Sequence, residues 1–133
     1  MSVLFIVLMN VSFSAQNSIQ YDWDGIKEFR FYGRNNPIAK KETHYILADN
    51  HKISELLNHT LKSEGYFPKG IQNYAIIIFN DSKQIIIQIL PGLPSPIRAV
   101  ENELFDDDWF EFDNDSAMKW IKYINELNEL LNN

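Results

Sequence analysis

The sequence predicts an α+β fold, in which an antiparallel sheet of about four to six strands carries two packed amphipathic helices. Three observations lead to this class: short β-branched and aromatic runs, two segments with apolar residues at helical spacing, and a strong hairpin pattern between them. The chain has 133 residues, of which 45% are hydrophobic. This length and composition fit one globular domain.

The first two strands are expected at residues 26–32 and 44–47. In the first of them, Phe29 and Phe31 alternate with Glu28 and Arg30. Alternation with a period of two is typical of a strand that is half-buried.

A helix is expected next, over residues 49–64. Asp49 or Asn50 can cap its start, and Gly65 suits the left-handed position just past its end. Its apolar residues recur at helical spacing and are Ile53, Leu56, Leu57 and Leu61.

The middle of the chain predicts a β-hairpin. Residues 74–79 and 84–90 are rich in isoleucine, and the polar residues 80–83 separate them. The three prolines of residues 91–96 indicate a stiff connection, or alternatively a recognition segment for a partner groove. Residues 97–100 and 109–112 are expected to form one further pair of edge strands.

The C-terminal helix is expected over residues 116–131. Asp113, Asp115 and Ser116 sit at its start, where carboxylates and a hydroxyl favour the positive end of a helix. Its apolar stripe consists of Ala117, Trp120, Ile121, Ile124, Leu127 and Leu131.

Residues 1–15 have the layout of a secretory signal peptide, so residues 16–133 would form the single domain. The segment has no charged side chain, its residues 3–11 form a stretch that is apolar except for Asn10, and Ser12 and Ser14 suit the −3 and −1 positions of a cleavage site. A basic residue before the apolar run is missing. The alternatives are a buried N-terminal strand and, least favoured, a membrane span, for which the run is short. An intact Met1 on the mature protein would contradict export.

The composition excludes several classes of site. A net charge of −6 argues against a general nucleic-acid binder, because affinity for nucleic acid comes mainly from Lys and Arg that neutralise phosphates. The chain has no cysteine, which excludes disulfides, thiol nucleophiles and Cys-based zinc sites. No phosphate loop, dinucleotide fingerprint, nucleophile elbow or H-E-x-x-H motif occurs, so we do not expect an enzyme.

The acidic segment, residues 101–115, is the strongest functional candidate. It contains eight carboxylates and no basic residue, interleaved with aromatic side chains. We expect it to bind a basic protein partner, with aromatic anchors inside an acidic rim. The expected contact residues are Glu103, Asp106, Asp107, Asp108, Trp109 and Glu111.

The acidic segment also has a purely structural interpretation. Its aromatics would then be core residues, its acids a solvated loop, and Asp113 and Asp115 only helix caps. A calcium site is less favoured, because the spacing does not match an EF-hand loop and the segment has no glycine for the turn.

His51, Glu55 and His59 are candidate metal ligands, because they fall at i, i+4 and i+8 of the first expected helix. The outer two would be about 12 Å apart at the helical rise, too far to bind one ion. We therefore expect a polar helix flank, and no metal or other cofactor.

These observations favour a small exported, non-enzymatic protein that binds another macromolecule through the acidic segment. A second hypothesis is a cytosolic immunity or inhibitor protein against a basic toxin, and a third is a hydrolase that uses carboxylates of this segment. The apolar leader and the Asn-, Ile- and Lys-rich usage resemble exported proteins of bacteria with AT-rich genomes, a likeness of composition alone.

Overall fold

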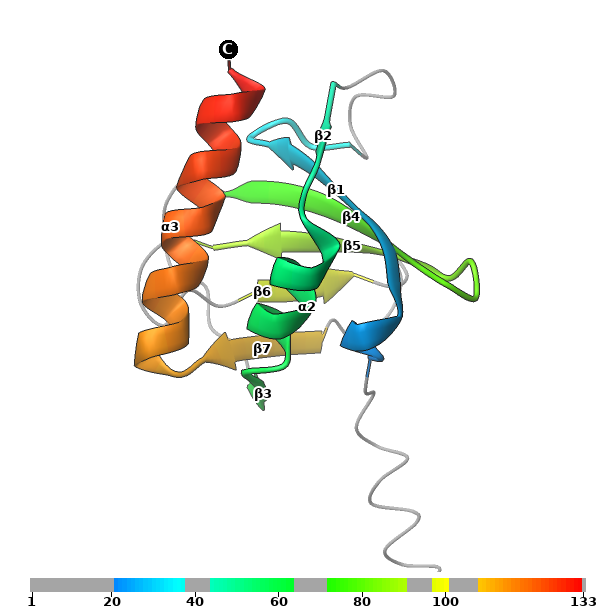
Figure 1. Ribbon diagram of the computed structural model, residues 1–133, viewed down its shortest axis with the longest axis vertical. Coiled ribbons are helices and arrows are strands. Elements are labelled where there is room, and N and C mark those ends of the chain that lie inside the picture. The colour runs from blue at the N-terminus through cyan, green and yellow to red at the C-terminus, as the bar shows by residue number, and fades with distance from the viewer. Residues whose placement is uncertain (1–20, 38–43, 64–71, 91–96, 101–107, 133) are drawn as a thin grey trace, which may run out of the picture.

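A computed structural model describes residues 21–37, 44–63, 72–90, 97–100 and 108–132 (Figure 1). These residues form an α+β fold, as the sequence predicts, with one antiparallel sheet and two α-helices. In chain order the elements are η1 (Trp23–Gly25), β1 (Ile26–Gly33), β2 (Ile46–Leu47), α2 (Asn50–Leu57), β3 (Thr60–Ser63), β4 (Asn73–Phe79), β5 (Gln84–Ile89), β6 (Ile97–Val100), β7 (Asp108–Phe112) and α3 (Asn114–Leu131).

The sheet has seven strands in the order β2-β1-β4-β5-β6-β7-β3, and every neighbouring pair is antiparallel. This count exceeds the expected four to six because residues 60–63 form a strand. The expected hairpin is present as β4 and β5, with Ile77 opposite Ile85. The strand expected at residues 44–47 is present as the two-residue β2.

The core lies between the sheet and the helices, which both cross the same sheet face (Figure 1). Phe29 on β1 pairs with Ile77 on β4, and Phe31 pairs with Ala75, so the apolar rows continue from strand to strand. The opposite face carries half-buried residues such as Arg30. The largest fully buried side chains are Trp120, Phe29, Phe31, Ile53, Leu57, Ile77, Ile85, Ile87 and Ile97.

Helix α2 starts as the sequence predicts. The Asp49 carboxylate accepts hydrogen bonds from the backbone N–H groups of His51 at 3.0 Å and Lys52 at 3.2 Å. These bonds satisfy two of the donors that the first turn of a helix leaves without a partner. Asp49 is therefore the cap, and Asn50 is the first helical residue.

The predicted end of this helix at residue 64 is wrong, because α2 ends at Leu57. The chain turns at Asn58 and His59, and Thr60 starts β3 opposite Phe112 of β7. Leu61 follows Leu57 at helical spacing, yet it lies on a sheet edge and is 76% exposed. The pairing with β7 is a long-range contact, and it overrides the local pattern. Gly65 lies outside the described residues.

Helix α3 comprises the 18 residues Asn114–Leu131, and its buried stripe largely matches the prediction. Trp120 is fully buried, with its ring stacked on Phe112 at 4.9 Å and edge-on to Phe29 at 6.3 Å. Tyr123 joins the stripe, although the sequence pattern did not single it out. Its hydroxyl accepts the backbone N–H of Asp49 at 2.9 Å, and this bond joins the two helices.

Gly33 closes β1 with a φ of +62°, a left-handed conformation that favours glycine. A Cβ at this position would lie 2.8 Å from Leu131 Cδ2 and 3.0 Å from Asn128 Oδ1. The end of β1 therefore packs against the last turns of α3 with no space for a side chain.

Strands β6 and β7 pair with each other as predicted, with Ile97 opposite Phe110. Their expected position at the sheet edge is wrong, because β3 continues the sheet beyond β7. This correction follows from the shortened α2, since its expected last turn supplies the true edge strand.

Candidate functional site

The structure describes only the second half of the acidic segment. Residues 101–107, which include Glu103, Asp106 and Asp107, lie outside the described residues. The rest of the segment is β7 and the start of α3. Asp108 is placed by its backbone, opposite Ala99 of β6.

Trp109 and Glu111 lie on the sheet face opposite the helices, in register with Arg98 and Leu61 respectively. Trp109 is only 8% exposed, and the Arg98 guanidinium carbon lies 5.7 Å from the centre of the indole ring. Glu111 is half-buried. Of these two expected contact residues, Glu111 thus offers more of its side chain to solvent than Trp109 does.

The described phenylalanines of the segment are core residues, as its structural interpretation requires. Phe110 packs against Trp23 with ring centres 5.6 Å apart, and Phe112 stacks on Trp120. The alternation of β7 turns both rings toward the helices, and Glu111 lies on the other face.

Asp113 caps α3. Its carboxylate accepts the backbone N–H of Ser116 at 2.8 Å and the Ser116 hydroxyl at 3.1 Å. These two hydrogen bonds, from the backbone first and the hydroxyl second, hold the pKa of Asp113 below its ordinary value. Asp115 follows in the first turn, where a negative charge is favoured.

This cap predicts an acid-sensitive contribution to stability. Because the pKa of Asp113 is lowered in the folded state, its contribution is complete above the unfolded-state pKa and is lost as the pH falls through the folded-state value. Asp113→Asn keeps an acceptor oxygen but has no such titration, so its stability should fall less steeply with acid. Denaturant unfolding from neutral to acidic pH measures this slope. Asp115→Asn is the control, and an unchanged slope in Asp113→Asn would contradict the prediction.

The two points where residues 101–107 join the sheet lie at one end of it. Val100 ends β6 opposite Ile86, near the start of β5, and β7 starts at Asp108 beside Ala99. The turn between β4 and β5 lies at this same end, and so does the start of β1, where Ile26 pairs with Phe79. Figure 1 shows this turn and η1 on the side to which β6 points.

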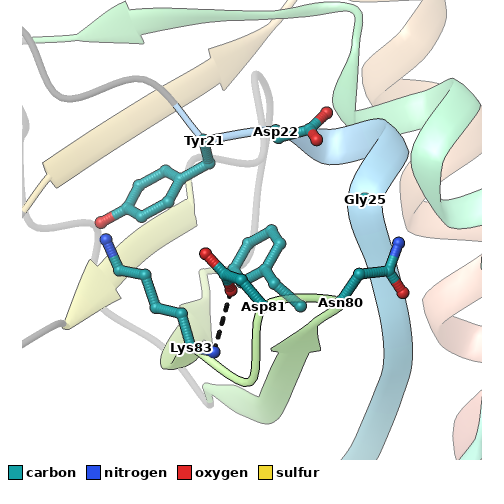
Figure 2. A pocket seen from close by; sticks show the side chains of 7 residues that line it. Tyr21, Asp22, Gly25, Asn80, Asp81 and Lys83 are labelled. Atoms are coloured by element: carbon teal, nitrogen blue, oxygen red, sulfur yellow. Dashed lines mark hydrogen bonds between the residues drawn. The ribbon is translucent and has the colours of Figure 1, made fainter.

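A pocket of about 300 Å³ lies at this end of the sheet, between η1 and the β4–β5 turn (Figure 2). The Tyr21 ring lies parallel to Phe79 with ring centres 6.1 Å apart. The Lys83 ammonium lies 5.4 Å from the centre of the Tyr21 ring. The pocket is lined by Tyr21, Asp22, Gly25, Phe79, Asn80, Asp81 and Lys83.

A backbone hydrogen bond connects the two walls of this pocket. The backbone N–H of Asn80 donates to the carbonyl of Gly25 at 2.8 Å, which ties the β4–β5 turn to η1. Within the turn, the backbone N–H of Lys83 donates to the Asp81 carboxylate at 3.0 Å. The sequence predicted the turn but not the pocket, because its walls come from segments more than fifty residues apart.

A second pocket of about 290 Å³ lies between α2 and α3. Lys52 extends over the Tyr123 ring, with its ammonium 4.4 Å from the ring centre. Burial of the Tyr123 hydroxyl raises its pKa. The charged lining mixes both signs and consists of Lys52, Glu55, Lys119, Lys122 and Glu126.

The interpretation of His51, Glu55 and His59 as a continuous helix flank needs correction. Helix α2 ends at Leu57, so His59 belongs to the turn before β3 and not to the helix. Within the described residues, no group of three or more His, Asp or Glu side chains could hold a metal ion.

The hydrolase hypothesis requires a buried carboxylate of the acidic segment in a pocket. Glu101, Glu103 and Asp106 lie outside the described residues. Glu111 is half-buried and lines neither of the two pockets above. Of the carboxylates that this hypothesis names, the one that the structure describes, Glu111, therefore lies outside both pockets.

None of the described helices is long and apolar enough to cross a bilayer. Comparison of the chain with protein-family models, curated proteins and solved structures finds nothing similar to it.

Proposed function

We propose that this chain is a non-enzymatic protein that binds a basic protein partner through the acidic segment, residues 101–115. The observation that carries the proposal is the position of Val100 and Asp108, the described residues on either side of residues 101–107, at the sheet end that also presents Asp22 and Asp81. Among the described residues, the carboxylates of Asp22 and Asp81 at this end would help to steer and orient a positively charged partner.

The distribution of charge supports this contact surface. The eight carboxylates of the segment exceed the net charge of −6, so the rest of the chain carries a small positive net charge. The excess negative charge that would attract a basic partner is therefore concentrated in one segment of the sequence. Trp109 and Phe110 are buried, so their side chains stabilise strand β7. The contact with the partner would then be made by the carboxylates of the acidic segment, which include the half-buried Glu111.

Export of the chain is part of this proposal, with residues 1–15 as its leader. The segment lacks charge and ends in small residues, as a leader does. The described sheet draws its strands from Ile26 to Phe112, so its described core is built from the part of the chain that would remain after cleavage. Sequencing the N-terminus of the mature protein tests export, because an intact Met1 would contradict it.

Loss of the acidic charges is expected to abolish capture of the partner. The variant Asp106→Asn/Asp107→Asn/Asp108→Asn removes three adjacent charges at unchanged side-chain volume, so a partner held by electrostatics should elute at much lower salt or not be retained. Pull-downs from native extract, eluted in salt steps, measure this. The matched control removes three charges from exposed positions of α2 and α3 outside the acidic segment, as Glu55→Gln/Glu126→Gln/Glu129→Gln, and should retain the partner. If the first variant captured the same partners with the same salt dependence, the contact assignment would be wrong.

A further inference from the structure

We propose that the pocket between η1 and the β4–β5 turn is a site for one cationic side chain of the basic partner, a guanidinium or alkylammonium group, held by the Tyr21 ring and the Asp81 carboxylate. This inference rests on the proposed function, which supplies the class of partner, a basic protein. It adds a specific binding pocket for one side chain of that partner. The pocket itself can be tested with a small cation and without the partner.

The first support is that the Tyr21 ring already faces a cation. The Lys83 ammonium lies 5.4 Å from the ring centre, within the range in which a cation is attracted to an aromatic face. Figure 2 shows the Lys83 side chain extending along the pocket toward Tyr21. The protein's own lysine thus demonstrates the chemistry that an incoming arginine or lysine would use.

The second support is the charge of the lining. Among the described residues of the lining, Asp22 and Asp81 contribute two carboxylates against the ammonium of Lys83, a formal charge of −1. In Figure 2 the Asp81 carboxylate lies beside Lys83, whereas the Asp22 carboxylate points away from it. Asp81 uses one oxygen to accept the Lys83 N–H in the turn. A carboxylate has further acceptor sites, which a guanidinium can engage.

The third support is the preorganisation of the walls. The backbone of the turn is held by hydrogen bonds from Asn80 to Gly25 and from Phe79 to the carbonyl of Lys83, both 2.8 Å long. A Cβ on Gly25 would lie 2.6 Å from the Asp22 carboxylate, so glycine permits this close approach. A volume of about 300 Å³ is at the lower end for ligand pockets, which suits one side chain better than a larger molecule.

The experiment titrates the full chain with N-acetyl-L-arginine amide and follows backbone amide and tyrosine ring resonances by NMR. The matched ligand is N-acetyl-L-citrulline amide, which has nearly the same shape and no charge. We expect the arginine derivative to shift the resonances of Tyr21, Asn80 and Asp81, and the citrulline derivative to leave them unchanged.

Two surface variants give opposite results if the inference holds. Asp81→Asn keeps the acceptor for the turn but removes the charge, and should weaken binding of the arginine derivative about two- to fivefold or more. Lys83→Met removes the competing ammonium from the ring and should strengthen binding by about the same factor. Glu129→Gln removes one exposed charge from α3 and should change nothing.

The inference is overturned if the citrulline derivative causes the same shifts, if the shifts appear only outside the pocket, or if Asp81→Asn and Lys83→Met leave the affinity unchanged. These outcomes are separable from failure of the proposed function. If the partner is captured by wild type and lost from the Asp106/Asp107/Asp108 variant, but the arginine derivative does not bind, only the pocket assignment fails. If the derivative binds and no partner is captured, the proposed function fails.

Discussion

Replacing Trp120 with alanine is expected to lower the free energy of unfolding by about 3–5 kcal/mol, a large fraction of the total for a domain of this size. Trp120 is fully buried and lies between Phe29 and Phe112, where it joins α3 to both β1 and β7. Truncation removes these contacts and leaves a cavity that a rigid sheet cannot close. Urea unfolding, followed by far-ultraviolet circular dichroism, measures the loss.

Trp120→Phe separates packing from hydrogen bonding at this site. The indole Nε1 of Trp120 is buried and has no hydrogen-bond partner among the described residues, so its desolvation costs about 1–3 kcal/mol. Phenylalanine keeps an aromatic ring against Phe29 and Phe112 and has no such N–H group. We therefore expect it to cost less than half as much as alanine. A loss equal to that of alanine would show that the ring contacts are not what Trp120 contributes.

Gly33→Ala is expected to lower the free energy of unfolding by about 1–3 kcal/mol, since an alanine in the left-handed region costs about 1–2 kcal/mol before any steric contact. The new Cβ would also lie 2.8 Å from Leu131 Cδ2 and 3.0 Å from Asn128 Oδ1. The same unfolding assay measures the effect.

Gly25→Ala is the matched control for Gly33. Its Cβ would meet a side-chain oxygen of Asp22 at 2.6 Å, but among the described glycines only Gly33 has a positive φ. The exposed Asp22 side chain can move aside, so the control should lose less stability than Gly33→Ala. If the control lost as much, steric contact would account for both effects and backbone strain for neither.

The sequence predicted those elements whose periodicity agrees with their environment. Phe29 and Phe31 alternate with polar residues because β1 has one face on the core, and the α3 stripe repeats because one side of that helix packs on the sheet. The same use of periodicity fails for residues 57–63. Leu61 follows Leu57 by four residues, but β3 gains its hydrogen bonds from β7, about fifty residues away. A local pattern contains no information about such a partner.

The candidate site was less accessible to sequence reasoning. The accumulation of carboxylates in residues 101–115 is visible in any reading of the chain, but the burial of Trp109 depends on its position beside Arg98 across the sheet. The pocket at Tyr21 was missed because it joins η1 to the β4–β5 turn through one backbone hydrogen bond from Asn80 to Gly25. The polar residues 80–83 predict a turn, but that this turn also lines a pocket follows only from its position beside η1 in the fold.

The two borders of the sheet have a consequence for solution behaviour. The described sheet ends in β2, with two residues, and in β3, with four residues that include the exposed Lys62. Because both edge strands are short and β3 carries a lysine, they give a neighbouring molecule few backbone groups with which to extend the sheet. The isoleucine-rich strands β4 and β5 lie inside the sheet and are paired on both sides, so they are not the strands that a neighbouring molecule would meet at its edge.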